Sequence, residues 1–408
     1  MTTNALRPLM TGRVLAFVGI ILVAANLRTA VGALSPILGR ISTDLPLSPL
    51  VVGLLGSMPP VCFALFGIIT PALVRRTKLE VVLIAALVAM LVGHLVRGFA
   101  GDVLVLVLGS ALTFAGLGLG NVLLPPIVKK YFPDRIALVT TIYVTMLSVS
   151  TLVPPLVAVP VADGSGWRVS LAMWASLCLV ALIPWVSLLL GNRRSATAPA
   201  IEEAKSTVVE KLWRSPLAWS LAVVFGLSSL NAYAMFAWLP SLLHDTVGVS
   251  DATAGVLLSV YAFMGFPAGL LIPVLAARMK NVALLVYVAV GFLVAGYLGL
   301  LLAPTAVPVI WVVLIGLGPL LFPLALVLIN LRSRTHDGAI ALSSFVQSVG
   351  YVIGAIGPLV VGITHDATGG WTVPLILLIC IAFVGIFAGA VVARNRTIED
   401  EVANHIRR

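Results

Sequence analysis

Twelve long apolar stretches alternate with short polar segments along the 408-residue chain. Each stretch is close to the 20 or so residues that a helix needs to cross the hydrocarbon core of a bilayer. Gly, Pro or charged residues mark the boundaries, and open β-sheets cannot span lipid. We therefore predict an all-α membrane protein with twelve transmembrane helices. The expected helices cover residues 14–38, 49–74, 80–99, 103–128, 136–161, 168–190, 216–241, 252–276, 282–302, 306–331, 338–363 and 371–393.

The composition agrees with this membrane assignment. Hydrophobic residues make up 60% of the chain and charged residues only 10%, whereas soluble domains carry about 25% charged residues. The three cysteines lie inside apolar stretches without metal-ligand or disulfide spacing. No acid/base pair, metal cluster or activated nucleophile is visible, so we predict no catalytic residues, no metal site, no cofactor and no enzyme activity.

Lysine and arginine predict how the chain is oriented. With the N-terminus in the cytoplasm, all but four of the 25 Lys and Arg residues lie in cytoplasmic segments, as the positive-inside rule requires. Arg40, Arg97 and Arg168 fall on the opposite side, and Arg28 falls within the membrane. We therefore expect both termini in the cytoplasm of a bacterial-type inner (cell) membrane. The net charge of +10 then reflects anionic lipid rather than nucleic acid.

The chain divides into two similar halves. The longest polar interruption predicts a cytoplasmic linker over residues 191–215, between a six-helix half at 1–190 and another at 216–408. Four patterns recur about 203 residues later, which indicates an internal duplication with a substrate site near the midplane, where the halves meet. The recurring pairs are Gly67–Pro71 with Gly269–Pro273, Pro36 with Pro240, Pro155 with Pro358, and Gly166-Trp167 with Gly370-Trp371.

Three segments resemble the cyanate and nitroimidazole transporter branch of the major facilitator superfamily. They are Asn26-Leu-Arg-Thr-Ala30 with Ser35-Pro36, Gly116–Pro125 leading into Lys129–Pro133, and Gly166-Trp167-Arg168. The resemblance covers essentially the whole chain. It implies a carrier that rocks two halves around a central site, acts as a monomer, and transports cyanate-like or nitroimidazole-like molecules.

Two departures from the superfamily pattern concern coupling. The loop signature between helices two and three survives as Gly67, Arg75 and Arg76, but Pro71 and Val74 replace its Asp and second Gly. The helix-four Arg that resembles a proton-coupling element is missing near Leu112. We assign a structural or gating role to Asn26, Gly67, Pro71, Arg75, Arg76, Gly269 and Pro273.

Arg28 is the candidate centre of the site. It is the only charged residue in the middle of an apolar stretch, and all fifteen acidic residues lie in loops, tails or at helix ends. A lone cation at membrane depth costs about 2.5–3.5 kcal/mol on insertion scales, which a bound anion would offset. The alternative is a structural clamp, in which Arg28 binds carbonyls or an Asn of a neighbouring helix.

The remaining candidates are polar residues that share an anion with arginine without adding charge. The repeat aligns Arg28 with Ala232, between Asn231 and Tyr233. Each candidate has interhelical packing as its alternative. The predicted substrate-binding residues are Arg28, Asn231, Tyr233, Tyr261, Gln347, Tyr351, Asn121 and Tyr143.

We therefore predict a secondary-active or facilitated transporter of a small anion or a small polar nitrogen-containing solute. Its partners are a small, anionic substrate and the lipid bilayer. A multidrug-type effluxer of apolar compounds, with Arg28 structural, is the first alternative. A membrane receptor that binds solute without transporting it is the second.

Overall fold

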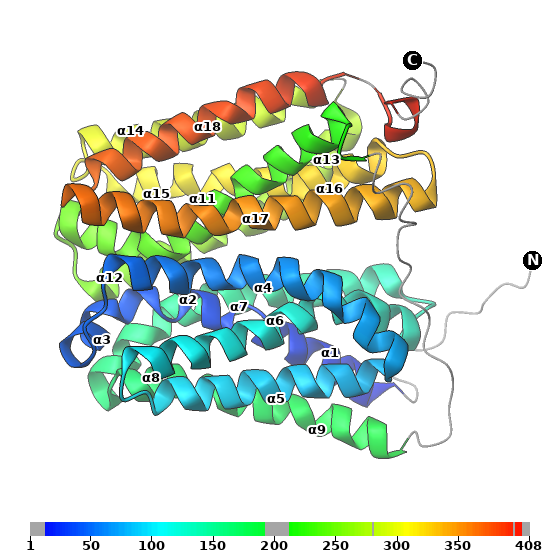
Figure 1. The fold of residues 1–408 in the computed structure, drawn as a ribbon, viewed down its shortest axis with the longest axis horizontal. Coiled ribbons are helices and arrows are strands. Elements are labelled where there is room, and N and C mark those ends of the chain that lie inside the picture. Colours follow the sequence, from blue (N-terminus) through cyan, green and yellow to red (C-terminus); the bar gives the residue numbers. More distant parts are fainter. Residues whose placement is uncertain (1–12, 192–211, 280, 395, 402–408) are drawn as a thin grey trace, which may run out of the picture. The chain divides into compact units, whose positions relative to one another are not determined.

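The computed structural model describes residues 13–191, 212–279, 281–394 and 396–401. All elements among these residues are helices (Figure 1). Twelve helices or consecutive helix pairs are long and apolar enough to cross a membrane, so the predicted all-α class and number of spans are confirmed. Part of the predicted linker at 191–215 lies outside the described residues.

The residues form two compact units. Unit 1 comprises residues 1–47 and 65–201, and unit 2 comprises residues 48–64 and 202–408. Helix α4 (Pro49–Arg76) begins in unit 2 and ends in unit 1. The predicted division into halves at 190 and 216 places the whole of this helix in the first half. That division stays a prediction.

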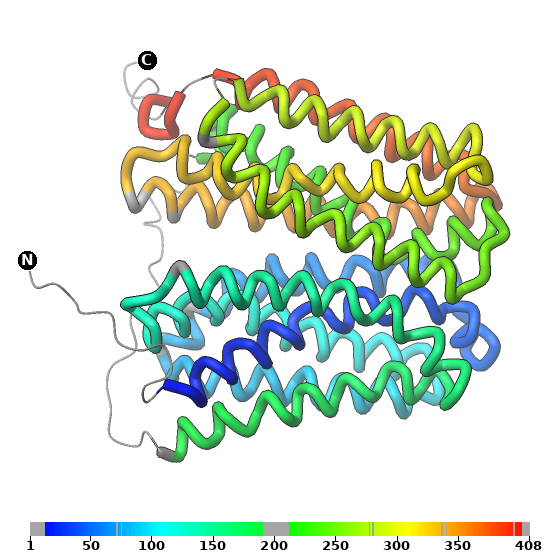
Figure 2. The backbone as a smooth tube through the Cα atoms, turned by 180° about the vertical axis from the view of Figure 1, so that it is seen from behind, coloured from blue at the N-terminus to red at the C-terminus, as the bar shows by residue number. Residues whose placement is uncertain are grey.

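Unit 1 holds the first six spans apart from the beginning of α4. Its aliphatic and aromatic residues fill the interior, and Asp102 begins one of the longest helices by accepting a hydrogen bond from the Val105 amide. Helices α5 and α6 lie side by side in both views (Figures 1 and 2). The elements are α1 (Val14–Asn26), α2 (Thr29–Gly32), the 3-10 helix η1 (Ser35–Ile37), α3 (Leu38–Asp44), the second part of α4, α5 (Leu79–Gly98), α6 (Val103–Tyr131), α7 (Ile136–Ser165), α8 (Trp167–Ala172) and α9 (Trp174–Gly191).

Unit 2 is centred on the pair α11 and α17, and α14 lies along α18 (Figure 2). Two of its spans are each made of consecutive short helices, α12 with α13 and α15 with α16. The elements are the first part of α4, α11 (Pro216–Val247), α12 (Asp251–Phe263), α13 (Gly265–Arg278), α14 (Ala283–Leu302), α15 (Pro308–Leu317), the 3-10 helix η2 (Gly318–Leu320), α16 (Leu321–Leu331), α17 (His336–Thr368) and α18 (Thr372–Val392).

The first part of α4 packs closely on α11 and α17. The Ser57 hydroxyl donates to the Ala355 carbonyl oxygen at 2.6 Å. A Cβ added at Gly56 would lie 2.6 Å from the Ala237 Cβ and 2.9 Å from the Pro358 Cβ. Such approaches exclude any side chain at that position, so Gly56 sets how near the three helices come.

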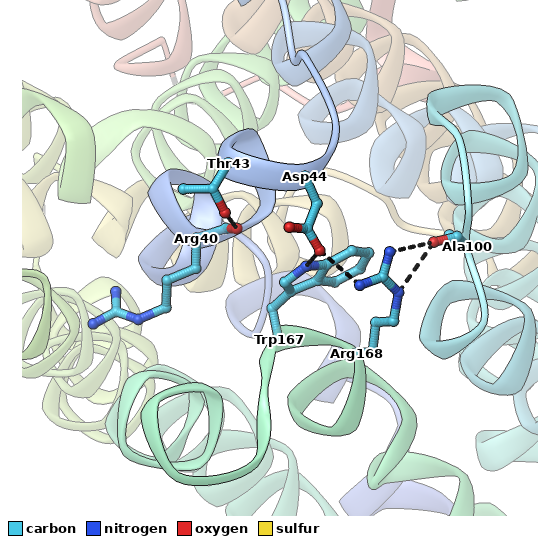
Figure 3. Close-up of polar contacts among 6 residues, drawn as sticks. All are labelled: Arg40, Thr43, Asp44, Ala100, Trp167 and Arg168. Atoms are coloured by element: carbon cyan, nitrogen blue, oxygen red, sulfur yellow. Dashed lines mark hydrogen bonds and ion pairs between the residues drawn. The ribbon is translucent and has the colours of Figure 1, made fainter.

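The duplication is visible as a repeated hydrogen bond between tryptophan and aspartate. In unit 1 the Trp167 Nε1 donates to Asp44 at 3.0 Å, and Arg168 donates to the same carboxylate at 2.7 Å and to the Ala100 carbonyl (Figure 3). In unit 2 the Trp371 Nε1 donates to Asp245 at 2.9 Å. The bonds from Trp167 and Arg168 lower the pKa of Asp44. In each unit, the same tryptophan–aspartate hydrogen bond thus links the sixth span to the first.

Candidate functional site

The first span is broken beside its predicted site residue. The sequence predicts one helix over 14–38, but α1 ends at Asn26 and α2 begins at Thr29, with Leu27 and Arg28 in a turn between them. The backbone bonds there become i to i+3, from Leu27 to Ala24 at 3.2 Å and from Val31 to Arg28 at 3.2 Å. Irregular backbone at membrane depth occurs where it is buried in protein or lines a cavity.

The polar neighbours of Arg28 make hydrogen bonds to backbone carbonyls within unit 1. The Asn26 amide donates to the Leu22 carbonyl at 2.8 Å and to the Leu177 carbonyl of α9 at 3.3 Å. The Thr29 hydroxyl donates to the Asn26 carbonyl at 3.0 Å. Asn26, Leu27 and Thr29 are at most 1% exposed, whereas Arg28 is only half-buried. Of these four residues, Arg28 alone keeps substantial accessible surface.

Helix α6 passes beside the turn. A Cβ added at Gly120 would lie 2.6 Å from the Leu27 Cδ2, so the adjacent Asn121 is near the level of the break. The Asn121 Nδ2 is buried, and no described residue accepts a hydrogen bond from it. Tyr143 of α7 is buried. Of the predicted unit 1 residues, Asn121 has a free polar group close to the turn that carries Arg28.

In unit 2 the predicted residues of α11 and α17 meet in an aromatic cluster. The Tyr351 ring lies 5.5 Å from Phe63 and 5.0 Å from Phe225, and Phe63 lies 6.3 Å from Tyr233, centroid to centroid. Gln347, one turn before Tyr351, donates to the Ser343 hydroxyl at 2.8 Å. Phe63 and Phe225 were not predicted as site residues, because a Phe in an apolar span is typical of core packing.

The bonds of Asn231 favour a structural role over the predicted substrate contact. Its side chain is fully buried, its Nδ2 donates to the Leu227 carbonyl at 2.8 Å, and its Oδ1 accepts from the Tyr297 hydroxyl of α14. Asn26 makes the same pattern: its Nδ2 bonds the carbonyl four residues earlier, and its Oδ1 accepts from the Cys178 thiol at 3.0 Å. The structural counterpart of Asn231 in unit 1 is thus Asn26 and not Arg28.

We expect Tyr297→Phe to destabilise the protein, because it leaves the buried Asn231 Oδ1 without the donor that it has in α14. An orphaned buried acceptor costs about 1–3 kcal/mol. Tyr261→Phe is the matched control, because no described residue bonds the buried Tyr261 hydroxyl. Thermal unfolding in detergent should show a melting temperature a few degrees lower for Tyr297→Phe and unchanged for Tyr261→Phe. Equal losses would contradict the assigned bond.

Comparison with known proteins decides the family. A family model described as the Major Facilitator Superfamily matches residues 16–355. The chain belongs to the major facilitator superfamily. It is therefore a multi-pass membrane transporter and not an enzyme, as the sequence predicted.

Three relatives narrow the branch within the superfamily. The chain is 35% identical to the uncharacterized transporter YycB of Bacillus subtilis (strain 168), over 93% of this chain and 94% of the relative. It is 33% identical to the 2-nitroimidazole transporter of Escherichia coli (strain K12), over 92% and 96%. It is 26% identical to the cyanate transport protein CynX of the same organism, over 86% and 90%. This major facilitator thus belongs to the branch that the sequence resemblance indicated.

A solved structure shows the same fold. The inward-facing, unoccupied structure of a bacterial homologue of the human lysosomal transporter Spinster matches with a TM-score of 0.78, covering 95% of this chain and 98% of that chain. The two sequences are 16% identical, so this likeness concerns the fold alone.

The structural and gating candidates of this major facilitator are only partly described. A Cβ added at Gly67 or at Gly269 would meet nothing within 4 Å. Arg76 is exposed, and Pro273 lies inside α13. The side chains of Pro71 and Arg75 lie outside the described part of the structure. Their gating roles stay predictions.

Arg97, at the non-cytoplasmic end of the predicted helix 80–99, has no hydrogen-bonded partner among the described residues. It lies in the last turn of α5, inside a span, and is fully buried. None of its three guanidinium nitrogens donates a hydrogen bond to a described residue. Its guanidinium carbon is 6.0 Å from the Phe114 ring centre, the outer limit of a cation–π contact, which is worth about 2 kcal/mol when desolvated. Burying an ion costs several kcal/mol, so this contact alone does not offset the cost.

Proposed function

We propose that this major facilitator transports a small anion or a small polar nitrogen-containing solute and that Arg28 binds it. The observation that carries the proposal is the position of Arg28 at a break in a membrane-spanning helix, half-buried between fully buried neighbours. Discontinuous helices supply the substrate sites of many carriers. A planar guanidinium suits a planar anion or a nitro group, to which it donates two parallel hydrogen bonds.

The printed names of two relatives support this substrate class. One is a transporter of 2-nitroimidazole and the other is a cyanate transport protein. Both molecules are small, polar and nitrogen-containing, and a cation with N–H donors can bind either. Asn121, near the same turn, has an amide that is able to share such a ligand.

One observation favours the second candidate, an effluxer of apolar compounds. Phe63, Phe225, Tyr233 and Tyr351 form the aromatic cluster of unit 2, and aromatic surfaces bind apolar ligands well. In this function Arg28 is structural, and the cluster provides the contacts.

Counterflow in proteoliposomes separates the candidates. Vesicles containing the full chain and loaded with unlabelled cyanate, nitrite or 2-nitroimidazole should accumulate the matching labelled solute, and control vesicles without protein should not. Accumulation of lipophilic dyes but of none of these solutes would replace the proposal by the effluxer. Binding of a solute without counterflow would indicate a receptor.

The membrane and the orientation belong to the same proposal. We infer a bacterial cell membrane with both termini cytoplasmic, supported by the distribution of Lys and Arg, and a protein that acts as a monomer. Accessibility of a cysteine introduced at either terminus to an impermeant thiol reagent tests the orientation.

A further inference from the structure

A second buried cation, independent of Arg28, lies in unit 1. Arg97 is 0% exposed, and none of its guanidinium nitrogens donates a hydrogen bond to a described residue. The guanidinium carbon lies over the Phe114 ring, 6.0 Å from its centre. A guanidinium has five N–H donors, and those of Arg97 have no described acceptor.

Other unsatisfied polar groups gather around Arg97. Ser110 follows Gly109, whose Cβ position is 3.1 Å from the Arg97 Cγ, and it shares a face of α6 with Phe114 four residues later. The Ser110 hydroxyl is buried without a described partner. Two neighbouring helices thus direct hydrogen-bond donors at one region of the unit.

Two further helices, α8 and α9, lie next to the same region. His94, one turn before Arg97, donates from Nδ1 to the Leu171 carbonyl of α8 at 3.2 Å. Trp174 begins α9 three residues after Leu171, and its buried Nε1 has no described partner. Helices α8 and α9 both pack along α5, and Leu171 lies beside His94, so α9 begins close to this stretch of α5.

The described carboxylates at the end of unit 1 where α5 ends already have other hydrogen-bond or ion-pair partners. Asp44 accepts from Trp167 and Arg168, as Figure 3 shows. Asp102 accepts from the Val105 amide, and Asp163 pairs with Arg40 at 2.5 Å. The counter-charge for Arg97 therefore has to come from outside the described chain.

We propose that Arg97, with Ser110 and Trp174, forms a buried site for a small monovalent inorganic anion of the size of chloride, bromide or nitrate. The site is built within one unit, from α5, α6 and α9, and it is separate from the proposed transport site at Arg28. Its anion neutralises the buried guanidinium and holds the three helices together. The bound anion stabilises the folded unit and is not itself carried across the membrane.

Anion-dependent thermal stability of the full-length protein tests the site. In wild type, replacing sodium gluconate by sodium chloride, bromide or nitrate at constant sodium concentration should raise the melting temperature by several degrees and then saturate. Bromide and nitrate destabilise most proteins non-specifically, so a rise marks binding. Arg28→Gln should keep this dependence, Ser110→Ala should weaken it, and Arg97→Met should remove it.

In gluconate, Arg97→Met is expected to change the melting temperature in the opposite direction. The variant should melt higher than wild type, because it removes an uncompensated buried charge. A wild-type melting temperature that is the same in all four salts would overturn the site, as would a dependence that survives in Arg97→Met. If Arg97→Met does not fold, anomalous scattering from wild-type crystals grown in bromide decides. A bromide peak beside Arg97 supports the site, and no peak there refutes it.

Discussion

Arg28→Ala is expected to reduce transport of the anion or nitro-compound substrate by about 10- to 100-fold or more in kcat/KM. A hydrogen bond to a charged group is worth about 1.5–3 kcal/mol, and the turn at Leu27–Arg28 offers a solute no other reachable cation among its residues. Arg28→Lys should retain part of the activity, because it keeps the charge but loses the planar fork that binds two oxygens at once. Counterflow in proteoliposomes measures both variants.

The control is Arg40→Gln, which removes a cation of the same unit. Arg40 pairs with Asp163, a partly exposed contact (26% and 57% exposed side chains) outside any predicted site, and exposed pairs contribute little to stability. Its transport should match wild type. Melting temperatures of all variants establish that the protein is folded. If Arg28→Ala and Arg28→Lys both transport at the wild-type rate, Arg28 is a structural clamp and the anion proposal fails.

The spans of this fold are predictable from sequence because a bilayer imposes one length and one polarity on every crossing helix. The interruptions inside a span are not. The break at Leu27–Arg28 contains neither Gly nor Pro, so no local signal announces it. The hydrogen-bond partners of Asn26 are Leu22 of its own helix and Leu177 and Cys178 of α9. The contacts with α9 join residues far apart in the sequence, and a sequence pattern does not predict them.

The candidate residues divide in the same way. The polar character of Asn231 was visible, but its partner Tyr297 lies 66 positions further on and an aromatic residue in an apolar span predicts only packing. Arg97 falls near the end of the predicted helix 80–99, where a charge is usually exposed. Its complete burial depends on how α5 packs against α6, which the sequence does not show. Sequence thus finds polar residues at membrane depth, and packing decides which of them face a ligand.

Gly56→Leu is expected to lower the melting temperature by several degrees and to impair transport. The added Cβ would lie 2.6 Å from the Ala237 Cβ and 2.9 Å from the Pro358 Cβ, both within the close contact that α4 makes with α11 and α17. Overpacking of this kind costs about 1–3 kcal/mol, and more where the backbone cannot move. The Ser57 hydrogen bond to the Ala355 carbonyl would stretch as α4 shifts away.

Gly67→Leu on the same helix is the matched control. Its Cβ would meet nothing within 4 Å, and leucine favours a helix by up to about 1 kcal/mol over glycine, so its melting temperature should be equal to wild type or higher. Transport by Gly67→Leu then tests the role given to this glycine, since a folded but inactive variant indicates gating and a fully active one does not. If Gly56→Leu melts and transports like wild type, the close packing of α4 against α11 and α17 is not part of the native protein.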